Sequence, residues 1–158
     1  MDKLIDDLIK LAFAEDIGDG DHTTLCCIPE TAMGKSQLII KEDGVLAGVE
    51  MAKRIFHDFD PELKMTVFIQ DGAEVKKGDI AFVVEGKIQS LLQTERLMLN
   101  VMQRMSGIAT TTRKYAKALE GTKTHVLDTR KTTPGMRMIE KEAVRIGGGM
   151  NHRICLLY

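Results

Sequence analysis

Apolar residues along the chain recur at helical spacing, then at strand spacing, and then at helical spacing again. Near the start, Leu4, Ile5 and Leu8 recur near the period of about 3.6 residues that places side chains on one face of a helix. This spacing predicts an amphipathic helix that ends at Gly18, because glycine favours helix termination. The sequence EDIGDGDHTT predicts a plain loop, because it is rich in turn formers and lacks the ligand spacing of a calcium-binding EF-hand.

Two β-rich regions follow, with a helix-like segment at residues 48–59 between them. Residues 36–48 and 64–87 are rich in β-branched residues and are broken by Asp-Gly or Lys-Gly pairs, which predicts strands joined by tight hairpin turns. The second region resembles the hairpin of biotinyl and lipoyl carrier domains. Because the lysine that those carriers present in a short turn is missing, this resemblance concerns the fold and not the function.

The spacing becomes helical again from Ile88 onward. Gly107 interrupts this pattern, so we expect a second helix at about residues 110–119 and a domain boundary near residue 107. The apolar residues expected on one face of the first helix are Ile88, Leu91, Leu92, Leu99 and Met102.

The last part of the chain predicts one βαβ unit. A short apolar strand, HVLDT, is followed by the loop RKTTPG, a helix at residues 136–146, three glycines and a second strand that begins about 23 residues after the first. Ligands of such units bind at the carboxyl ends of the parallel strands. Four cationic or hydrogen-bonding side chains are expected to converge at that end: Arg130, Lys131, His152 and Arg153.

The net charge of −1 conceals an asymmetry between the two halves of the chain. Residues 96–153 contain 12 Lys and Arg against 4 Asp and Glu, a net charge of +8, whereas residues 1–95 contain 10 against 19, a net charge of −9. Clustered cations favour an anionic partner, although solvated helical faces explain the surplus equally well. A nucleic-acid partner is not expected, because the chain has no Trp, few aromatic residues and no recognised binding motif.

The composition, with 44% hydrophobic and 28% charged residues, is typical of a folded globular protein. No apolar run approaches the roughly 18 residues that span a bilayer, and the amino terminus lacks the apolar region of a secretory signal. We therefore expect a cytoplasmic protein with no membrane partner. Cys26 and Cys27 are adjacent and Cys155 is distant, which favours reduced thiols over a disulfide framework or a structural metal site.

Several longer motifs, in a fixed order, are more specific than any single residue. LDTRKTTPGMR is followed by KEAVRIGGGMNHR, and both are preceded by TERLMLNVMQRMSGIAT. The first two look like the paired signature of the quinolinate phosphoribosyltransferase family, and the third is similar to the inter-domain helix of that family. Further upstream, DIGDGDHTT and DGVLAGVEMAKRIF match its amino-terminal domain, so the resemblance covers nearly the whole chain.

The resemblance implies an α+β amino-terminal sandwich domain at residues 1–107, followed at residues 108–158 by the first βαβ part of an incomplete (β/α) barrel. The segment after Gly107 holds only two predicted strands, so the rest of the barrel needs on the order of 100 more residues. Another substrate-binding lysine and the acidic groups for ribose and Mg²⁺ are expected beyond residue 158. The sequence ICLLY after the last motif also departs from the family, which places an acid there.

The resemblance also implies an activity, that of a carboxylating nicotinate-nucleotide pyrophosphorylase in NAD biosynthesis. Quinolinate and phosphoribosyl pyrophosphate, with Mg²⁺, would give nicotinate mononucleotide, pyrophosphate and CO₂. Within this chain Arg130 and Lys131 are the expected catalytic residues. Arg130, His152 and Arg153 would bind the carboxylates of quinolinate, Thr129 would supply a hydroxyl or backbone donor, and Lys131 would face the phosphates.

Arg96 matches the arginine with which the family reaches into the active site of a neighbouring subunit, so the resemblance implies a homodimer or a larger homo-oligomer. Simpler interpretations exist for each residue: Arg130 and Lys131 as a solvated loop pair, His152 as a donor to a buried carbonyl, and glycines 147–149 as a helix stop. The order of the motifs favours the enzyme, although the chain alone is expected to be inactive. The alternative is a noncatalytic remnant that dimerises or binds anions.

Overall fold

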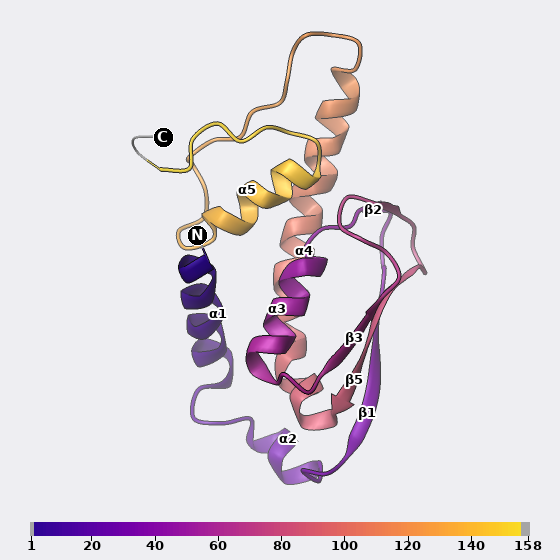
Figure 1. Cartoon of the computed structure of the whole chain (residues 1–158), viewed down its shortest axis with the longest axis vertical. Helices are drawn as coiled ribbons and strands as arrows, with labels where there is room; N and C mark the ends of the chain where they lie inside the picture. Colours follow the sequence, from indigo (N-terminus) through magenta and orange to yellow (C-terminus); the bar gives the residue numbers. More distant parts are fainter. Residues whose placement is uncertain (1, 156–158) are drawn as a thin grey trace.

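A three-stranded antiparallel sheet with helices packed around it precedes one long helix and a shorter helix that packs across it (Figure 1). This computed structural model describes residues 2–155. The sequence ICLLY, which departs from the family pattern, therefore has its last three residues outside the described range. The elements are α1 (Asp2–Ile17), α2 (His22–Cys27), β1 (Met33–Ile39), β2 (Gly44–Val45), α3 (Val49–Phe59), β3 (Lys64–Val67), β4 (Glu74–Val75), β5 (Ile80–Lys87), α4 (Ile88–Ala118) and α5 (Arg137–Ile146).

Strand β5 forms the centre of the sheet, with β1 and β3 antiparallel to it on either side. Its Phe82 is paired with Leu38 of β1 and Val67 of β3, and it is 1% exposed. A separate pair, β2 and β4, lies next to α4. The predicted strands are confirmed, and Gly72 (φ +89°) and Gly78 (φ +99°) occupy the left-handed region that favours glycine. The predicted hairpins are wrong, because β1 pairs with β5 and β2 pairs with β4, so no two consecutive strands of the described chain are paired.

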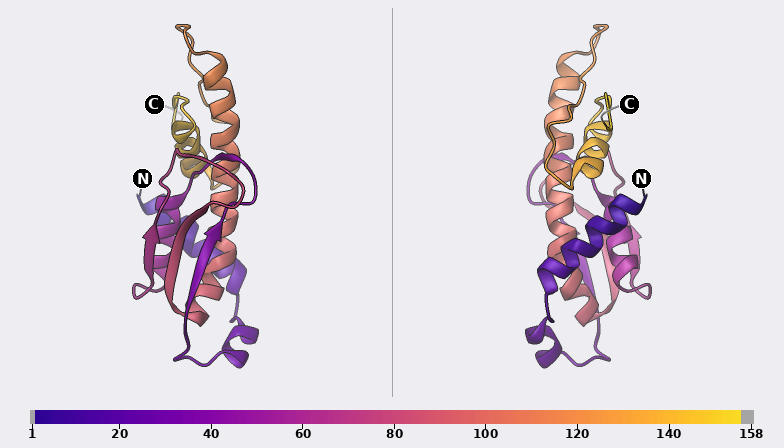
Figure 2. Two further views of the ribbon diagram at one scale, coloured as in Figure 1. Left: turned by 90° about the vertical axis from the view of Figure 1, so that its right-hand side faces the viewer. Right: turned by 90° about the vertical axis from the view of Figure 1, so that its left-hand side faces the viewer.

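Helix α3, which confirms the predicted segment 48–59, packs on the sheet and on α4 (Figure 2). The rings of Phe56 on α3 and Phe82 on β5 meet edge to face, with their centroids 6.3 Å apart. Ile55 and Ala52 of the same helix are fully buried. This apolar layer between sheet and helices forms the core of the protein.

Helix α4 is a single element of 31 residues, about 46 Å long, that contacts α1, α2, α3 and α5. The expected break at Gly107 and the separate helix at residues 110–119 are wrong, because α4 continues through both. A glycine inside a helix costs only about 1 kcal/mol relative to alanine. Packing along the neighbouring turns outweighs that cost, since Met105 and Ala109 are buried on either side.

The predicted apolar face of α4 is wrong in part. Leu91 and Met102 are buried, but Leu92 is 43% exposed and Leu99 is 37% exposed. The side chains that face the core follow a neighbouring stripe instead. They include Leu91, Thr94, Met98, Val101, Met105, Ala109 and Thr112.

The first helix is confirmed as α1, which is followed by Gly18 at φ +58°. The loop expected at EDIGDGDHTT is wrong in part, because its first three residues end α1 and its last three begin α2. Asp21 starts α2 by accepting the backbone N–H of Thr24 at 3.1 Å. A hydrogen bond with the side chain of Thr24, followed by this backbone hydrogen bond, holds the pKa of Asp21 below its ordinary value.

Beyond α4 the two predicted parallel strands are reduced to one parallel bridge between Leu127 and Met150. The N–H of Met150 donates to the carbonyl of Val126 at 2.8 Å, and the N–H of Asp128 donates to the carbonyl of Met150 at 3.1 Å. The direction and the spacing of 23 residues agree with the predicted βαβ unit, and α5 confirms its helix.

Glycines 147–149 let the end of α5 lie directly on α4. A Cβ at Gly147 would stand 2.6 Å from the carbonyl oxygen of Ala109, closer than side chains tolerate. Arg113 of α4 secures this contact by donating to the carbonyls of Gly147 at 3.0 Å and Ile146 at 3.2 Å. A cation is favourable at these carbonyls, because they end a helix.

Candidate functional site

The parallel bridge aligns the two segments that carry most of the predicted site residues. Counted onward from the bridge in parallel register, Thr129 and His152 stand at equivalent positions, as do Arg130 and Arg153. Lys131 follows by one residue. The structure therefore brings five of the six predicted site residues onto two neighbouring stretches of chain, which we call the TRK segment (129–131) and the HR segment (152–153).

The side chains of these two segments are open to a ligand. Thr129, Lys131, His152 and Arg153 are exposed, and Arg130 is half-buried. The Nε of Arg130 is buried and has no hydrogen-bond partner among the described residues. An unpaired buried N–H is costly, so this guanidinium is suited to an incoming carboxylate or phosphate oxygen. The hydroxyl of Thr129 instead accepts the backbone N–H of Lys131 at 3.2 Å, which shapes the turn.

Arg96 lies apart from the other five residues. It projects from α4 toward the far end of α1, where its guanidinium donates to Asp16 at 2.7 Å. Its side chain is 72% exposed, and it borders a hollow of about 310 Å³ together with Asp21 and His22. None of the described residues that line this hollow belongs to the TRK or HR segment.

An ion pair between Asp128 and Lys141 lies beneath the two segments. Oδ2 of Asp128 and Nζ of Lys141 are 2.5 Å apart, and the two side chains are only 4% and 3% exposed. The other oxygen of Asp128, Oδ1, accepts the backbone N–H of His152 at 2.8 Å. In the orientation that satisfies its neighbours, the Asn151 amide donates to Asp128 Oδ2 at 2.9 Å and to the carbonyl of Lys141 at 3.0 Å.

Arg137, at the start of α5, ties the two segments together from the other side. Its Nε donates to the hydroxyl of Thr132 at 3.0 Å, and its terminal nitrogens donate to the carbonyl oxygens of Arg130 at 3.4 Å and Ile154 at 3.2 Å. One guanidinium thus contacts the chain at or just beyond each segment. The rigid fork of five donors makes arginine well suited to such a role.

Glu140 fixes the loop between the TRK segment and α5. Its Oε2 accepts the backbone N–H of Thr133 at 3.2 Å, and its Oε1 accepts hydrogen bonds from Arg104 of α4, the one from Nε at 2.8 Å. Burial disfavours the charged carboxylate, but the hydrogen bonds from Arg104 and Thr133 outweigh it and hold the pKa of Glu140 below its ordinary value. Arg104 is therefore engaged in structure and is not a free cation.

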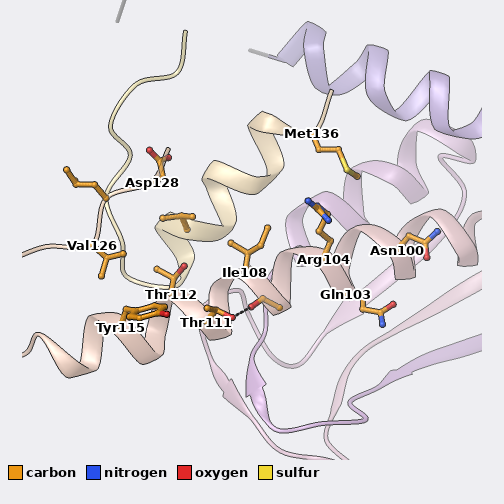
Figure 3. Close-up of a pocket in the computed structure, with 13 residues that line it drawn as sticks. Asn100, Gln103, Arg104, Ile108, Thr111, Thr112, Tyr115, Val126, Asp128 and Met136 are labelled. Atoms are coloured by element: carbon orange, nitrogen blue, oxygen red, sulfur yellow. Dashed lines mark hydrogen bonds between the residues drawn. The ribbon is translucent and has the colours of Figure 1, made fainter. Parts of the chain in front are cut away.

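A hollow of about 800 Å³ lies between α4 and the segment that leads to the bridge (Figure 3). Gln103, Ile108 and Tyr115 of α4 line one wall, and Val126 and Asp128 lie on the opposite side (Figure 3). None of the predicted substrate-binding residues lines this hollow. The hollow and the predicted site are therefore different features, and Asp128, which lines the hollow, is next to Thr129 in the chain.

Metal-binding clusters and membrane-spanning helices are both absent from residues 2–155. Within that range no group of three or more His, Cys, Asp or Glu side chains is placed to hold a metal ion. In the same part of the chain no helix is long and apolar enough to cross a membrane.

Sequence reasoning identified the exposed cations but missed the side chains that hold them. Asp128, Glu140 and Lys141 lie within the recognised motifs, but the motifs by themselves indicate no role for them. The available signal was an acid immediately before the TRK segment and a Glu-Lys pair on the following helix. Charged residues beside a predicted site can serve as its support as well as its ligands.

Comparison with protein families gives two adjoining matches. The model described as the quinolinate phosphoribosyl transferase N-terminal domain matches residues 21–106, and the model of the C-terminal domain of the same family matches residues 108–157. Among curated proteins, quinolinate phosphoribosyltransferase [decarboxylating] 1 of Nicotiana glauca is 47% identical over 150 residues, which cover 94% of this chain and 42% of the relative.

Two solved structures show the same fold. NadC of Streptococcus pyogenes superposes with a TM-score of 0.93 at 42% identity, over 97% of this chain and 54% of that one. The nicotinate-nucleotide pyrophosphorylase of Francisella tularensis gives a TM-score of 0.91 at 36% identity, over 99% and 56%. These likenesses confirm the predicted class, a small α+β domain followed by the start of a barrel-type domain. The chain spans about half the length of the relatives that it matches.

Proposed function

Because the chain belongs to the quinolinate phosphoribosyltransferase family, we propose that the whole protein transfers a phosphoribosyl group from phosphoribosyl pyrophosphate to quinolinate, with loss of CO₂. The products would be nicotinate mononucleotide, pyrophosphate and CO₂. Within this chain the proposal is supported mainly by the arrangement of the TRK and HR segments, which lie side by side. The buried Nε of Arg130 in the TRK segment lacks a hydrogen-bond partner within the described part of the chain.

The carboxylates of quinolinate would be bound by Arg130, His152 and Arg153. Quinolinate is a planar aromatic dicarboxylate, and guanidinium groups match the geometry of a carboxylate with two parallel hydrogen bonds. The half-buried Arg130 would contribute most, because its interaction with an anion is screened least by water. The exposed His152 and Arg153 would complete the clamp from the neighbouring segment.

Lys131 would face the phosphoribosyl pyrophosphate, whereas Thr129 would supply a hydroxyl or backbone donor beside the quinolinate carboxylates. A lysine ammonium acts on phosphate as a point charge, and Lys131 is exposed at the end of its segment. As the bond from ribose C1 to pyrophosphate breaks, the ribose gains positive charge and the leaving group gains negative charge. Orientation of the two substrates and stabilisation of the leaving group would supply most of the catalysis, and no protein nucleophile is needed.

Loss of CO₂ would follow the transfer. Once the ring nitrogen is bonded to ribose it carries a positive charge, and the neighbouring carboxylate can leave as CO₂. The electron pair of the broken carbon–carbon bond stays on the ring carbon, next to the positive nitrogen, and a proton then takes its place. The cationic clamp would therefore serve to hold and orient the ring during both steps.

Arg96 would act in the site of a second subunit. Its exposure, and its place beside Asp16 in a hollow that contains no described residue of the TRK or HR segment, support a role between chains and not within one. In the same proposal the protein works as a homodimer or a larger homo-oligomer, and residues 1–107 and 108–158 belong to its two domains. The two family matches meet at that boundary, and α4 runs across it.

We also propose that Mg²⁺ binds together with the pyrophosphate group. The protein is proposed to be cytoplasmic. Mg²⁺ would neutralise charge on the leaving group. Residues 2–155 offer no cluster of acids or histidines for a metal ion, so we assign no step to it.

The test is turnover of quinolinate by the full-length protein that carries this chain. We expect wild-type protein to convert quinolinate and phosphoribosyl pyrophosphate to nicotinate mononucleotide. Arg130→Ala should lower kcat/KM by a factor that corresponds to about 2 to 5 kcal/mol, the cost of removing the partner of a bound carboxylate. The matched control is Arg145→Ala, which removes an exposed arginine of α5 that pairs with Glu142 on its own helix. Equal effects of the two substitutions would contradict the proposed site.

A further inference from the structure

We propose that Asp128 is a positioning residue of the proposed site, and that it aligns the HR segment with the TRK segment through the backbone N–H of His152. The proposal rests on the proposed function for its kinetic part, and on geometry alone for its structural part. The carboxylate of Asp128 immediately precedes Thr129 in the chain and accepts the His152 N–H at 2.8 Å. One side chain thus connects the bases of both segments.

The surroundings of Asp128 hold it in one orientation. Its side chain is 4% exposed, and its second oxygen is taken up by Lys141 at 2.5 Å and by the Asn151 amide at 2.9 Å. A charged hydrogen-bond acceptor with three partners has little freedom to rotate. The HR segment, exposed and attached to the bridge by few backbone bonds, depends on this fixed acceptor for its register.

Lys141 has a defined part in this arrangement. It lies on α5, 3% exposed, and its ammonium is bonded to Asp128, so it is not available to a substrate phosphate. Its function would be to neutralise and orient Asp128. This assignment separates Lys141 from Lys131, whose exposed ammonium is proposed to bind the substrate.

The experiment compares two double variants of the full-length protein, D128N/K141M and D128L/K141M. Both remove the ion pair, and Asn and Leu have nearly the shape of Asp. They differ in hydrogen-bonding capacity, because the amide oxygen of the introduced asparagine would still accept the His152 N–H, whereas a leucine side chain has no acceptor for this N–H or for the Asn151 amide. Replacing a buried ion pair by neutral groups of similar volume is commonly tolerated, so both variants are expected to fold.

We expect the KM for quinolinate of D128L/K141M to be at least tenfold above that of D128N/K141M, with kcat within threefold and Tm values within a few degrees. Amide hydrogen exchange at His152, measured without substrate, should be at least tenfold faster in D128L/K141M. A purely stabilising role for Asp128 would leave KM and His152 exchange equal in the two variants, and that result would overturn the proposal.

Two further outcomes are decisive. If D128L/K141M does not fold, the comparison of D128N/K141M with wild type carries the test, because this variant keeps the acceptor and leaves no buried lysine unpaired. A KM within threefold of wild type then supports the proposal, and a larger rise overturns it. If the wild-type protein does not turn over quinolinate, the proposed function fails. The exchange rates at His152 still decide the structural part, and equal rates in D128N/K141M and D128L/K141M overturn it.

Discussion

The sheet region and the carboxyl-terminal segment of the molecule are held by different interactions. The sheet region packs Phe82, Ile55 and their neighbours into an apolar core that has hardly any exposed surface. The segment beyond α4 places only a few apolar side chains, such as Ile139 and Ala143, in that core. Its loops are fixed mainly by charged groups, among them the pair of Asp128 and Lys141.

This difference indicates how the two regions divide the work of folding and function. Apolar burial is non-directional and determines where helices and strands pack. Hydrogen bonds to charged groups are directional and hold single backbone groups in one orientation. The loops that carry the proposed ligand groups need the second kind of restraint. The two regions should therefore respond differently to truncation, added volume, pH and removal of surface charge.

The largest effect is expected from breaking the sheet region. Phe82→Ala should lower the free energy of unfolding by about 3 to 5 kcal/mol, because a fully buried ring is lost and a cavity remains. Chemical denaturation monitored by circular dichroism measures it. Phe68→Ala is the matched control, since Phe68 is 60% exposed and its truncation should change stability little. Similar losses for the two phenylalanines would contradict the assigned core.

The contact between the two regions should be sensitive to added volume. Gly147→Ala inserts a methyl group 2.6 Å from the carbonyl oxygen of Ala109 on α4, and overpacking of this kind costs about 1 to 3 kcal/mol. Gly107→Ala should instead stabilise by about 0.5 to 1 kcal/mol, because nothing lies near its Cβ position and alanine favours the helix. Thermal unfolding of the two variants should shift in opposite directions; shifts in the same direction would argue against this packing.

The hydrogen bonds to charged side chains should make the stability of the carboxyl-terminal segment sensitive to acid. The pKa of Glu140 is lowered in the folded state, so its carboxylate stabilises the fold above its unfolded pKa near 4.5 and loses that contribution as the pH falls through the lower folded value. Glu140→Gln should therefore cost about 1 to 3 kcal/mol at pH 7 and progressively less below pH 4.5.

Urea titrations of Glu140→Gln and wild type at several pH values measure this dependence. Glu142→Gln is the control. The pKa of Glu142 is also lowered, by its hydrogen bond with Arg145, but its side chain is 44% exposed and water screens the pair. A pH-independent cost for Glu140→Gln would contradict the carboxylate role.

The smallest effect on stability is expected at Arg96. Its ion pair with Asp16 is exposed, so Arg96→Ala should change the free energy of unfolding by about 1 kcal/mol or less. Activity of the full-length protein should respond differently, because the proposed role of Arg96 lies in a second subunit. Mixing inactive Arg96→Ala and Arg130→Ala chains should restore roughly a quarter of wild-type activity. A two-fold dimer of this kind has one intact site, and about half of the dimers are mixed. Proven subunit exchange without recovery would place Arg96 in the site of its own chain.

The elements of the sheet region were predictable because local signals decide them, namely β-branched residues in the strands and glycine in the turns. The strand pairing was not, because it joins segments far apart in the chain. In residues 48–59 and 64–87 the signal for each helix or strand lies within that segment itself. The structure forms the predicted helix and strands there. The errors arose where tertiary packing selects among local alternatives. Leu92 and Leu99 are seven residues apart, so they lie on one face of α4. Their spacing does not tell whether that face is buried, and in the structure both side chains are exposed. Gly107 predicts a break by its residue type alone, whereas the helix on both sides of it is packed.

The site was predictable only in part. The motifs predict Arg130 and the HR segment as site residues, which stays a prediction, and the spacing of the βαβ unit agrees with a parallel bridge between residues 23 apart. The supporting pair of Asp128 and Lys141 was not predictable from periodicity, because its members lie on a loop and a helix thirteen residues apart. Which charges are buried and which reach solvent depends on the packing of α5 against α4.

The unbroken course of α4 has a mechanical consequence. Helices of this length curve gently and kink only at a specific defect, and α4 is packed against β2 and α5 along its length. The point where the two family matches meet is therefore neither a hinge nor a linker open to proteases. The sheet region and the base of the TRK and HR segments would turn together as one stiff unit, so within residues 2–155 any movement of the proposed site relative to the sheet would come from its loops.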